Sequence, residues 1–114
     1  MRSPLVALML LSGTAAASAT TVTIDLPGDE TPQTEKVSYA CGDKTVAATY
    51  INTTGNQFAV LELGDATVVV VTVMSGSGAR YVGQHYEWWT KGDAATLTDL
   101  MQDPQKPIEC NLSK

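Results

Sequence analysis

The chain has 114 residues, and its 7 basic and 12 acidic side chains give a net charge of −5 at pH 7. Such an acidic surface repels nucleic acid and anionic membranes, which argues against both as partners, and it favours cationic partners. One histidine and two cysteines are too few for a typical zinc site, so we expect no metal, and we expect no cofactor.

The N-terminal residues have the order of a secretory signal peptide. Arg2 precedes an apolar run that starts at Leu5, and small residues then lead to an A-x-A cleavage site ending at Ala19. The 15 residues from Leu5 to Ala19 fall short of the roughly 20 that cross a bilayer. We therefore predict a signal peptide over residues 1–19. Loss of Arg2 would leave 6 basic and 12 acidic residues, a net charge of −6.

The mature chain is long enough for one compact domain but not for two. Residues 20–35 begin as a possible short strand, Val22–Leu26, and then become polar and rich in Pro and Gly. We expect them to form a flexible lead-in, followed by a domain over residues 36–114.

Short β-favouring runs separated by turn signals fill that domain, and their spacing predicts an all-β antiparallel sandwich or a small barrel. Val68–Val71 is apolar on both faces, which predicts a central, covered strand. Leu97, Leu100 and Met101 have helical spacing, so a short helix within 94–101 is an alternative. The runs are 36–41, 45–51, 57–63, 67–74, 79–82, 86–90, 94–98 and 107–112.

The two cysteines, Cys41 and Cys110, lie near the two ends of the mature domain. In an exported protein the default for such a pair is a disulfide, and here it would enclose most of the domain. Loop-closure arithmetic gives roughly 4 kcal/mol of stabilisation for such a loop. We therefore predict one disulfide, Cys41–Cys110.

The segment SGSGARYVGQHYEWWTKG, residues 75–92, stands out from the Val/Thr-rich chain around it. Its Ser-Gly pairs predict either a protruding loop tip that presents small hydroxyls or a simple tight turn. Lys91-Gly92 ends the next hairpin, so a hydroxyl and an ammonium would share one end of a barrel. Trp88 and Trp89 are strand neighbours and should point to opposite faces, one inward and one outward. Packing is the favoured role for both, and sugar stacking is the alternative.

The same segment holds Ser77 and His85, and Asp93 follows it, which completes the residue types of a hydrolase triad. However, no G-x-S-x-G elbow is present, and the eight-residue spacings in a small sheet leave no cleft for a substrate. We therefore predict that the protein is not an enzyme.

Two motifs of this segment occur together in a known family. Residues 77–81 fit S-G-x-x-Y, and residues 86–92 fit Y-x-x-x-T-K-G. With the paired cysteines, they resemble the MliC/PliC family of bacterial inhibitors of c-type lysozyme. The resemblance runs from Tyr39 to Cys110 and implies an eight-stranded antiparallel β-barrel. Ser75 does not fit the first motif, because Ala79 stands where the motif requires tyrosine.

By this resemblance, Ser77 and Lys91 would enter the lysozyme cleft and contact its catalytic carboxyl groups. The other motif residues would mainly shape the two loops, with some direct contact; they are Gly78, Tyr81, Tyr86, Thr90 and Gly92. Membrane-bound members carry a lipobox cysteine, whereas Thr14 follows Leu11-Ser12-Gly13 here. We therefore expect no lipid anchor and a periplasmic protein. The alternative function is a periplasmic module that binds glycan or other envelope components, and a dimer is left open.

Overall fold

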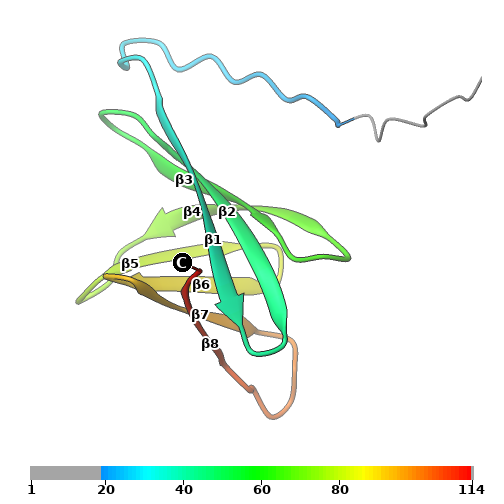
Figure 1. Ribbon diagram of the computed structural model, residues 1–114. Helices are drawn as coiled ribbons and strands as arrows, with labels where there is room; N and C mark the ends of the chain where they lie inside the picture. The colour runs from blue at the N-terminus through cyan, green and yellow to red at the C-terminus, as the bar shows by residue number, and fades with distance from the viewer. Residues whose placement is uncertain (1–18, 114) are drawn as a thin grey trace, which may run out of the picture.

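The computed structural model describes residues 19–113 of the chain, and within them it forms a closed barrel of eight antiparallel strands (Figure 1). Each strand pairs with the next along the chain, and β1 pairs with β8 to close the barrel. The strands are β1 Gln33–Cys41, β2 Lys44–Asn52, β3 Gln57–Glu62, β4 Thr67–Val73, β5 Ala79–Gly83, β6 Tyr86–Lys91, β7 Ala94–Asp99 and β8 Ile108–Leu112. The all-β expectation is confirmed, and of the two architectures that the runs allowed, the barrel is the one formed.

Alternation along each strand separates a filled interior from the outer surface, because successive side chains of a strand point to opposite faces. In β3, for example, Ala59 and Leu61 are buried, whereas Phe58 and Val60 remain partly exposed. A small barrel of this kind is filled by its own side chains and needs no ligand to complete its core. The largest fully buried side chains are Trp88, Leu61, Val46 and Val70, together with the two cysteines.

An aromatic cluster occupies the interior, and its polar atoms satisfy one another. The Tyr39 and Tyr50 hydroxyls lie 2.8 Å apart, and the Trp88 indole N–H donates to the Tyr50 hydroxyl at 2.9 Å. Tyr39 and Trp88 meet edge to face, with ring centroids 5.0 Å apart. Burial raises the pKa of Tyr39, Tyr50 and Tyr81, so all three hydroxyls are neutral and available as donors at pH 7.

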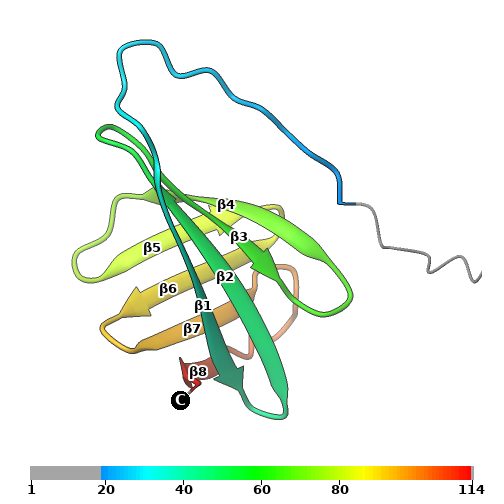
Figure 2. The ribbon, with the colours of Figure 1, turned by 45° about the horizontal axis from the view of Figure 1, so that its top comes forward.

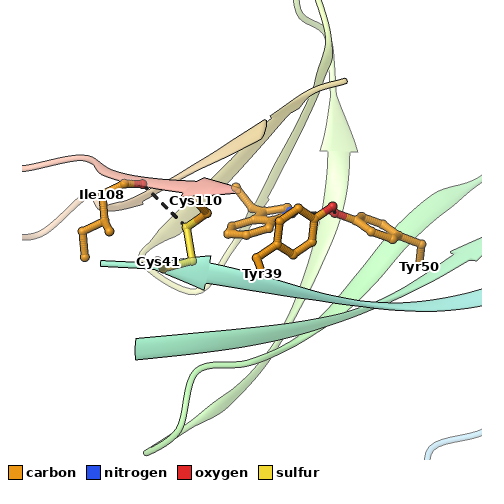
Figure 3. The surroundings of a disulfide bond; sticks show 6 residues. Tyr39, Cys41, Tyr50, Ile108 and Cys110 are labelled. Atoms are coloured by element: carbon orange, nitrogen blue, oxygen red, sulfur yellow. Dashed lines mark hydrogen bonds between the residues drawn. A yellow bond between two sulfur atoms is a disulfide. The ribbon is translucent and has the colours of Figure 1, made fainter. Parts of the chain in front are cut away.

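The predicted disulfide between Cys41 and Cys110 is present and ties β1 to β8 (Figure 3). The two residues are direct partners in the register of these strands, and their Cα atoms lie 4.2 Å apart. The bond therefore locks the seam where the first and last strands meet. Figure 3 also shows Tyr39 and Tyr50 meeting inside the barrel beside it.

Several predicted boundaries shift. β1 begins at Gln33, so the first three residues of this strand belong to the segment that the sequence assigned to the lead-in. The possible strand at Val22–Leu26 does not form. Residues 94–101 form a strand as far as Asp99 and then a turn, and the helical alternative is wrong. The predicted signal peptide lies outside the described residues, except for Ala19. Between residues 19 and 113, no helix is long and apolar enough to span a membrane.

The prediction that β4 is covered on both faces is wrong. Val68 and Val70 are buried inside the barrel, but Val69 and Val71 point outward and are 56% and 50% exposed. A closed barrel has no second layer to cover its outer face, so one side of the four-valine run is exposed to solvent. β-branched residues suit an exposed strand as well as a buried one, which explains the misleading signal.

Asp29 attaches the lead-in to the β2–β3 turn. Its carboxylate accepts hydrogen bonds from the Thr53 hydroxyl at 2.6 Å, the Asn56 side-chain amide at 3.0 Å and the Gly55 N–H at 3.3 Å. These bonds hold the pKa of Asp29 at about 2, below its ordinary 3.8. The sequence did not predict this anchor, because the partners lie in the β2–β3 turn, more than twenty residues away.

Candidate functional site

The two loops singled out in the sequence lie together at one end of the barrel. We call them the tip: the β4–β5 loop, residues 74–78, and the β6–β7 turn, residues 91–94. In an up-and-down barrel alternate connections emerge at the same end, so one hairpin between the two loops places them side by side. Both loops appear at the left in Figure 2, as they do in Figure 1. The prediction that they share an edge is confirmed.

Gly78 packs the first loop against the second. It adopts a positive φ of 64°, which favours glycine, and a side chain here would collide with the Thr90 carbonyl oxygen and lie 2.8 Å from the Lys91 Cγ. The backbone of Gly78 therefore rests directly on the end of β6. The Ser75 hydroxyl donates to the Gly78 carbonyl at 3.2 Å and folds the loop back on itself. Ser75 thus has a local role in the loop, whereas Ser77 is exposed.

Lys91 is the last residue of β6 and is exposed beside Ser77. Its Nζ lies 5.1 Å from the centroid of the Trp89 ring, within the range of a cation–π contact. The ion pairs among residues 19–113 join other side chains, so no carboxylate of this part of the chain neutralises Lys91. The tip therefore presents the Ser77 hydroxyl and the Lys91 ammonium to solvent, with the exposed Asp93 in the same turn but in no ion pair with Lys91.

Trp89 connects the two loops. Its indole N–H donates to the backbone carbonyl of Ser77 at 2.8 Å, and its ring lies beside the Lys91 ammonium. The expected inward and outward directions of the tryptophan pair are confirmed, since Trp88 is fully buried and Trp89 is partly exposed on the outer face. The bond from Trp89 to Ser77 was not predicted from the sequence. The pattern that could have indicated it is an outward-facing tryptophan two residues before Lys91, on the same face of the strand.

Two other motif residues support the tip from within. The Thr90 hydroxyl donates to the Ala79 carbonyl at 3.4 Å, across the register pair that joins the first residue of β5 to β6. Tyr81 is only 5% exposed and points into the barrel, with its ring centroid 5.8 Å from that of Tyr50. Thr90 and Tyr81 line a hollow of about 330 Å³ at the barrel mouth, together with Gly92 of the tip.

Tyr86 lies away from the tip, which differs from the expectation that it shapes these loops. It begins β6, whereas Lys91 ends it, so the two stand at opposite ends of the barrel. Its ring lies 4.2 Å from that of His85 in the β5–β6 turn. His85 in turn pairs with Asp99 through an Nδ1–Oδ1 contact of 2.7 Å, which lowers the pKa of Asp99. Sequence reasoning missed this His–Asp pair, because the two residues are neighbours only through the β6–β7 register.

The same geometry separates the residues of the triad considered in the sequence. Ser77 lies at the tip, whereas His85 lies at the opposite end and pairs with Asp99 rather than with Asp93. The triad of Ser77, His85 and Asp93 is therefore not assembled. Residues 19–113 also contain no group of three or more His, Cys, Asp or Glu side chains that could hold a metal ion.

The comparison with family models decides the relationship. Residues 39–106, which include both loops of the tip, match the family described as membrane-bound lysozyme inhibitor of c-type lysozyme, MliC. The chain belongs to this family. MliC proteins are inhibitors and not enzymes, in agreement with the prediction from the missing elbow and cleft.

Individual relatives agree with the family match. The chain is 43% identical over 98 residues to a membrane-bound lysozyme inhibitor of C-type lysozyme from Cupriavidus necator, covering 85% of this chain and 78% of the relative. It is 42% identical over 74 residues to a protein of the same description from Pseudomonas aeruginosa, covering 63% and 58%. The crystal structure of Pseudomonas aeruginosa MliC in complex with hen egg white lysozyme matches with a TM-score of 0.71 and 34% identity, covering 84% of this chain and 99% of that one.

Proposed function

We propose that this MliC-family protein inhibits c-type lysozyme by inserting Ser77 and Lys91 into the active-site cleft of the enzyme. The observation that carries the proposal is the tip itself, where these two exposed side chains stand on adjacent loops locked together at Gly78. The similarity to a relative solved in complex with hen egg white lysozyme supports the choice of partner.

The chemistry of the tip suits the target. A c-type lysozyme cleaves glycosidic bonds with two carboxyl groups, one held protonated as a general acid and the other ionised. The Ser77 hydroxyl donates one hydrogen bond and accepts others, so it matches a position between a protonated and an ionised carboxyl group. The Lys91 ammonium adds a charge-assisted contact with the ionised one. A side chain on a β-hairpin loop offers the enzyme no glycosidic bond to cleave.

The net charge of the chain assists the encounter. The active-site cleft of a c-type lysozyme carries carboxyl groups that can face Lys91. The rest of the surface of such lysozymes is typically basic. Opposite net charges then increase the association rate without fixing the orientation. The acidic chain, with a net charge of −5, attracts the basic lysozyme, and the contacts of the tip make the binding specific for the cleft.

We place the protein in the periplasm, as a form without a lipid anchor, on the predicted signal peptide and on Thr14 at the lipobox cysteine position. The relatives from Cupriavidus necator and Pseudomonas aeruginosa are described as membrane-bound, so this chain would differ from them in its attachment. Fractionation of cells that express the full chain tests the point. Release with the soluble periplasmic fraction agrees with it, and labelling by radioactive fatty acid contradicts it.

A glycan-binding module remains the second candidate, and one observation favours it. Trp89 lines an open groove of about 320 Å³ on the outer face, with polar neighbours that include Glu87 and Lys91. An aromatic face beside polar groups is a usual sugar platform. Direct binding of peptidoglycan fragments in the absence of lysozyme would support this function, and inhibition without such binding would support the first.

The deciding experiment is a titration of c-type lysozyme with the mature protein and with tip variants, read as inhibition of cell-wall lysis and as binding affinity. Lys91→Ala should weaken binding by roughly 2–4 kcal/mol, the usual cost of removing one partner of a desolvated charge pair. Ser77→Ala should cost about 1–3 kcal/mol through lost hydrogen bonds to carboxyl groups.

Lys106→Ala is the matched control, because Lys106 is exposed near the opposite end of the barrel, before β8. It removes the same charge and should leave inhibition nearly unchanged. Full inhibition by both tip variants would exclude the proposed contacts. An absence of inhibition by folded, oxidised wild-type protein would exclude the function.

A further inference from the structure

Trp89 contacts both Ser77 and Lys91, the two residues proposed to enter the lysozyme cleft. We propose that Trp89 is a positioning residue that sets the Ser77 loop and the Lys91 side chain at the same time. This inference rests on the proposed function, which needs both groups held in one geometry. It adds that their geometry depends on a third side chain that contacts both.

The first link is a hydrogen bond. The Trp89 indole N–H donates to the Ser77 carbonyl in the β4–β5 loop at 2.8 Å. Indole offers one donor and no acceptor, so this bond fixes the ring and the loop relative to each other. Apart from it, the loop is held by the Ser75 hydroxyl, which bonds within the loop, and by the contact of Gly78 with β6.

The second link is electrostatic. The Lys91 ammonium lies 5.1 Å from the Trp89 ring centroid, and an exposed lysine would otherwise sample many rotamers. The Trp89 ring thus restricts Lys91 before any partner arrives. Such restriction in the free protein increases affinity, because less conformational entropy is lost on binding.

The Trp89 ring is itself held in place from β5. Arg80 is the register partner of Trp89, and its guanidinium lies 5.9 Å from the ring centroid. The Arg80 Nε also forms a 2.7 Å ion pair with Glu87, which is partly buried on the same outer face. The ion pair with Glu87 therefore holds Arg80 beside the Trp89 ring.

Two substitutions separate the links. Trp89→Phe keeps an aromatic face for Lys91 but removes the N–H that binds Ser77, and it should weaken lysozyme binding roughly 3- to 10-fold. Trp89→Leu removes both links and should weaken binding roughly 10- to 50-fold. Thr96→Val is the control, because Thr96 pairs with Trp89 across the strands and lines the same groove without contacting Ser77. It should bind as the wild type does.

Pairwise combinations distinguish positioning from direct contact. In the Trp89→Phe background, Ser77→Ala should reduce the free energy of lysozyme binding by less than it does in the wild type. Lys91→Ala should reduce it by the same amount as in the wild type. In Trp89→Leu, both losses should shrink. If Trp89 acted only by touching lysozyme, the effects would simply add, and that result would overturn the inference.

A second measurement needs no lysozyme. Backbone ¹⁵N relaxation of the free protein should show increased motion at residues 76–78 in Trp89→Phe, with no change at Gly64 in the β3–β4 turn. Unchanged relaxation at residues 76–78 would overturn the positioning role even if binding fell. If Trp89 variants bind normally while Ser77→Ala and Lys91→Ala do not, positioning fails and the inhibitor function stands. If none of these variants affects binding, the contacts of the proposed function fail as well.

Discussion

Trp88 and Trp89 are neighbours in β6, yet they belong to two different regions of the molecule. Both indole N–H groups donate a hydrogen bond of similar length, at 2.9 Å from Trp88 and 2.8 Å from Trp89. The Trp88 acceptor is the Tyr50 hydroxyl inside the barrel, and the Trp89 acceptor is the Ser77 carbonyl at the tip. One bond completes the core, and the other joins the outer face of β6 to an exposed loop.

The difference arises from strand alternation alone, since adjacent residues of a strand face opposite sides of a sheet. One strand thus carries side chains of the core on one face and a side chain that contacts the tip on the other. Substitutions that point inward should change the free energy of unfolding, and substitutions that point outward near the tip should change binding. Three predictions test this separation, and they are given in decreasing order of the change that we expect.

Trp88→Leu should produce the largest loss. Trp88 is fully buried at the edge of the Tyr39 ring, and its replacement leaves a cavity and deprives the Tyr50 hydroxyl of a donor. Large-to-small changes of this kind cost roughly 3–5 kcal/mol of unfolding free energy. Urea denaturation followed by far-UV circular dichroism measures the loss. Trp89→Leu, its neighbour on the outer face, should cost less than about 1 kcal/mol. Equal losses at the two positions would contradict the separation.

Gly78→Ala should affect both properties, because Gly78 is where the tip touches the barrel. Alanine is disfavoured at a φ of 64°, and its methyl group would collide with the Thr90 carbonyl. We expect a loss of roughly 1–3 kcal/mol of unfolding free energy together with a large loss of lysozyme inhibition. Thermal unfolding and the inhibition titration measure the two effects.

The control for that change is Gly76→Ala, two residues earlier in the same loop. No atom lies within 4 Å of a methyl group built there, and no positive φ is required. Its unfolding free energy should match that of the wild type to within about 0.5 kcal/mol. A similar stability loss at both glycines would mean that the contact with β6 is not what constrains the loop.

The smallest effect should appear in acid, at the lead-in. The pKa of Asp29 is held at about 2 in the folded protein, below its ordinary 3.8. The hydrogen bonds of its ionised carboxylate therefore stabilise the folded state in full at pH values above 3.8. That contribution to stability should be lost as the pH falls through about 2. Protonation of Asp29 should then release the lead-in from the β2–β3 turn. Amide chemical shifts of Gly55 and Asn56, recorded between pH 5 and pH 1.5, would report the release.

Asp29→Asn separates this effect from Asp99, whose pKa is also lowered. The variant should show the released shifts at every pH, while the interior amides of the barrel stay unchanged. A titration of the Asn56 amide that persists in Asp29→Asn would contradict the assignment to Asp29.

Sequence patterns predicted the all-β class, eight short strands in agreement with the family resemblance, the disulfide and the two loops of the tip. These features depend on local patterns, since turn residues, strand propensity and short motifs act over a few neighbouring positions. The same patterns failed at Val69 and Val71, because an apolar run does not reveal whether a second layer exists to cover it.

Contacts between residues far apart in the sequence became evident from the three-dimensional fold. Asp29 reaches Thr53, His85 reaches Asp99, and Trp89 reaches Ser77, in each case over more than ten positions of sequence. Pairing of β5, β6 and β7 brings Ser77 close to Trp89 and His85 close to Asp99, and the lead-in folds back on the β2–β3 turn to bring Asp29 to Thr53. Spacing along the chain does not encode such contacts, because they depend on how strands pair rather than on how residues follow one another.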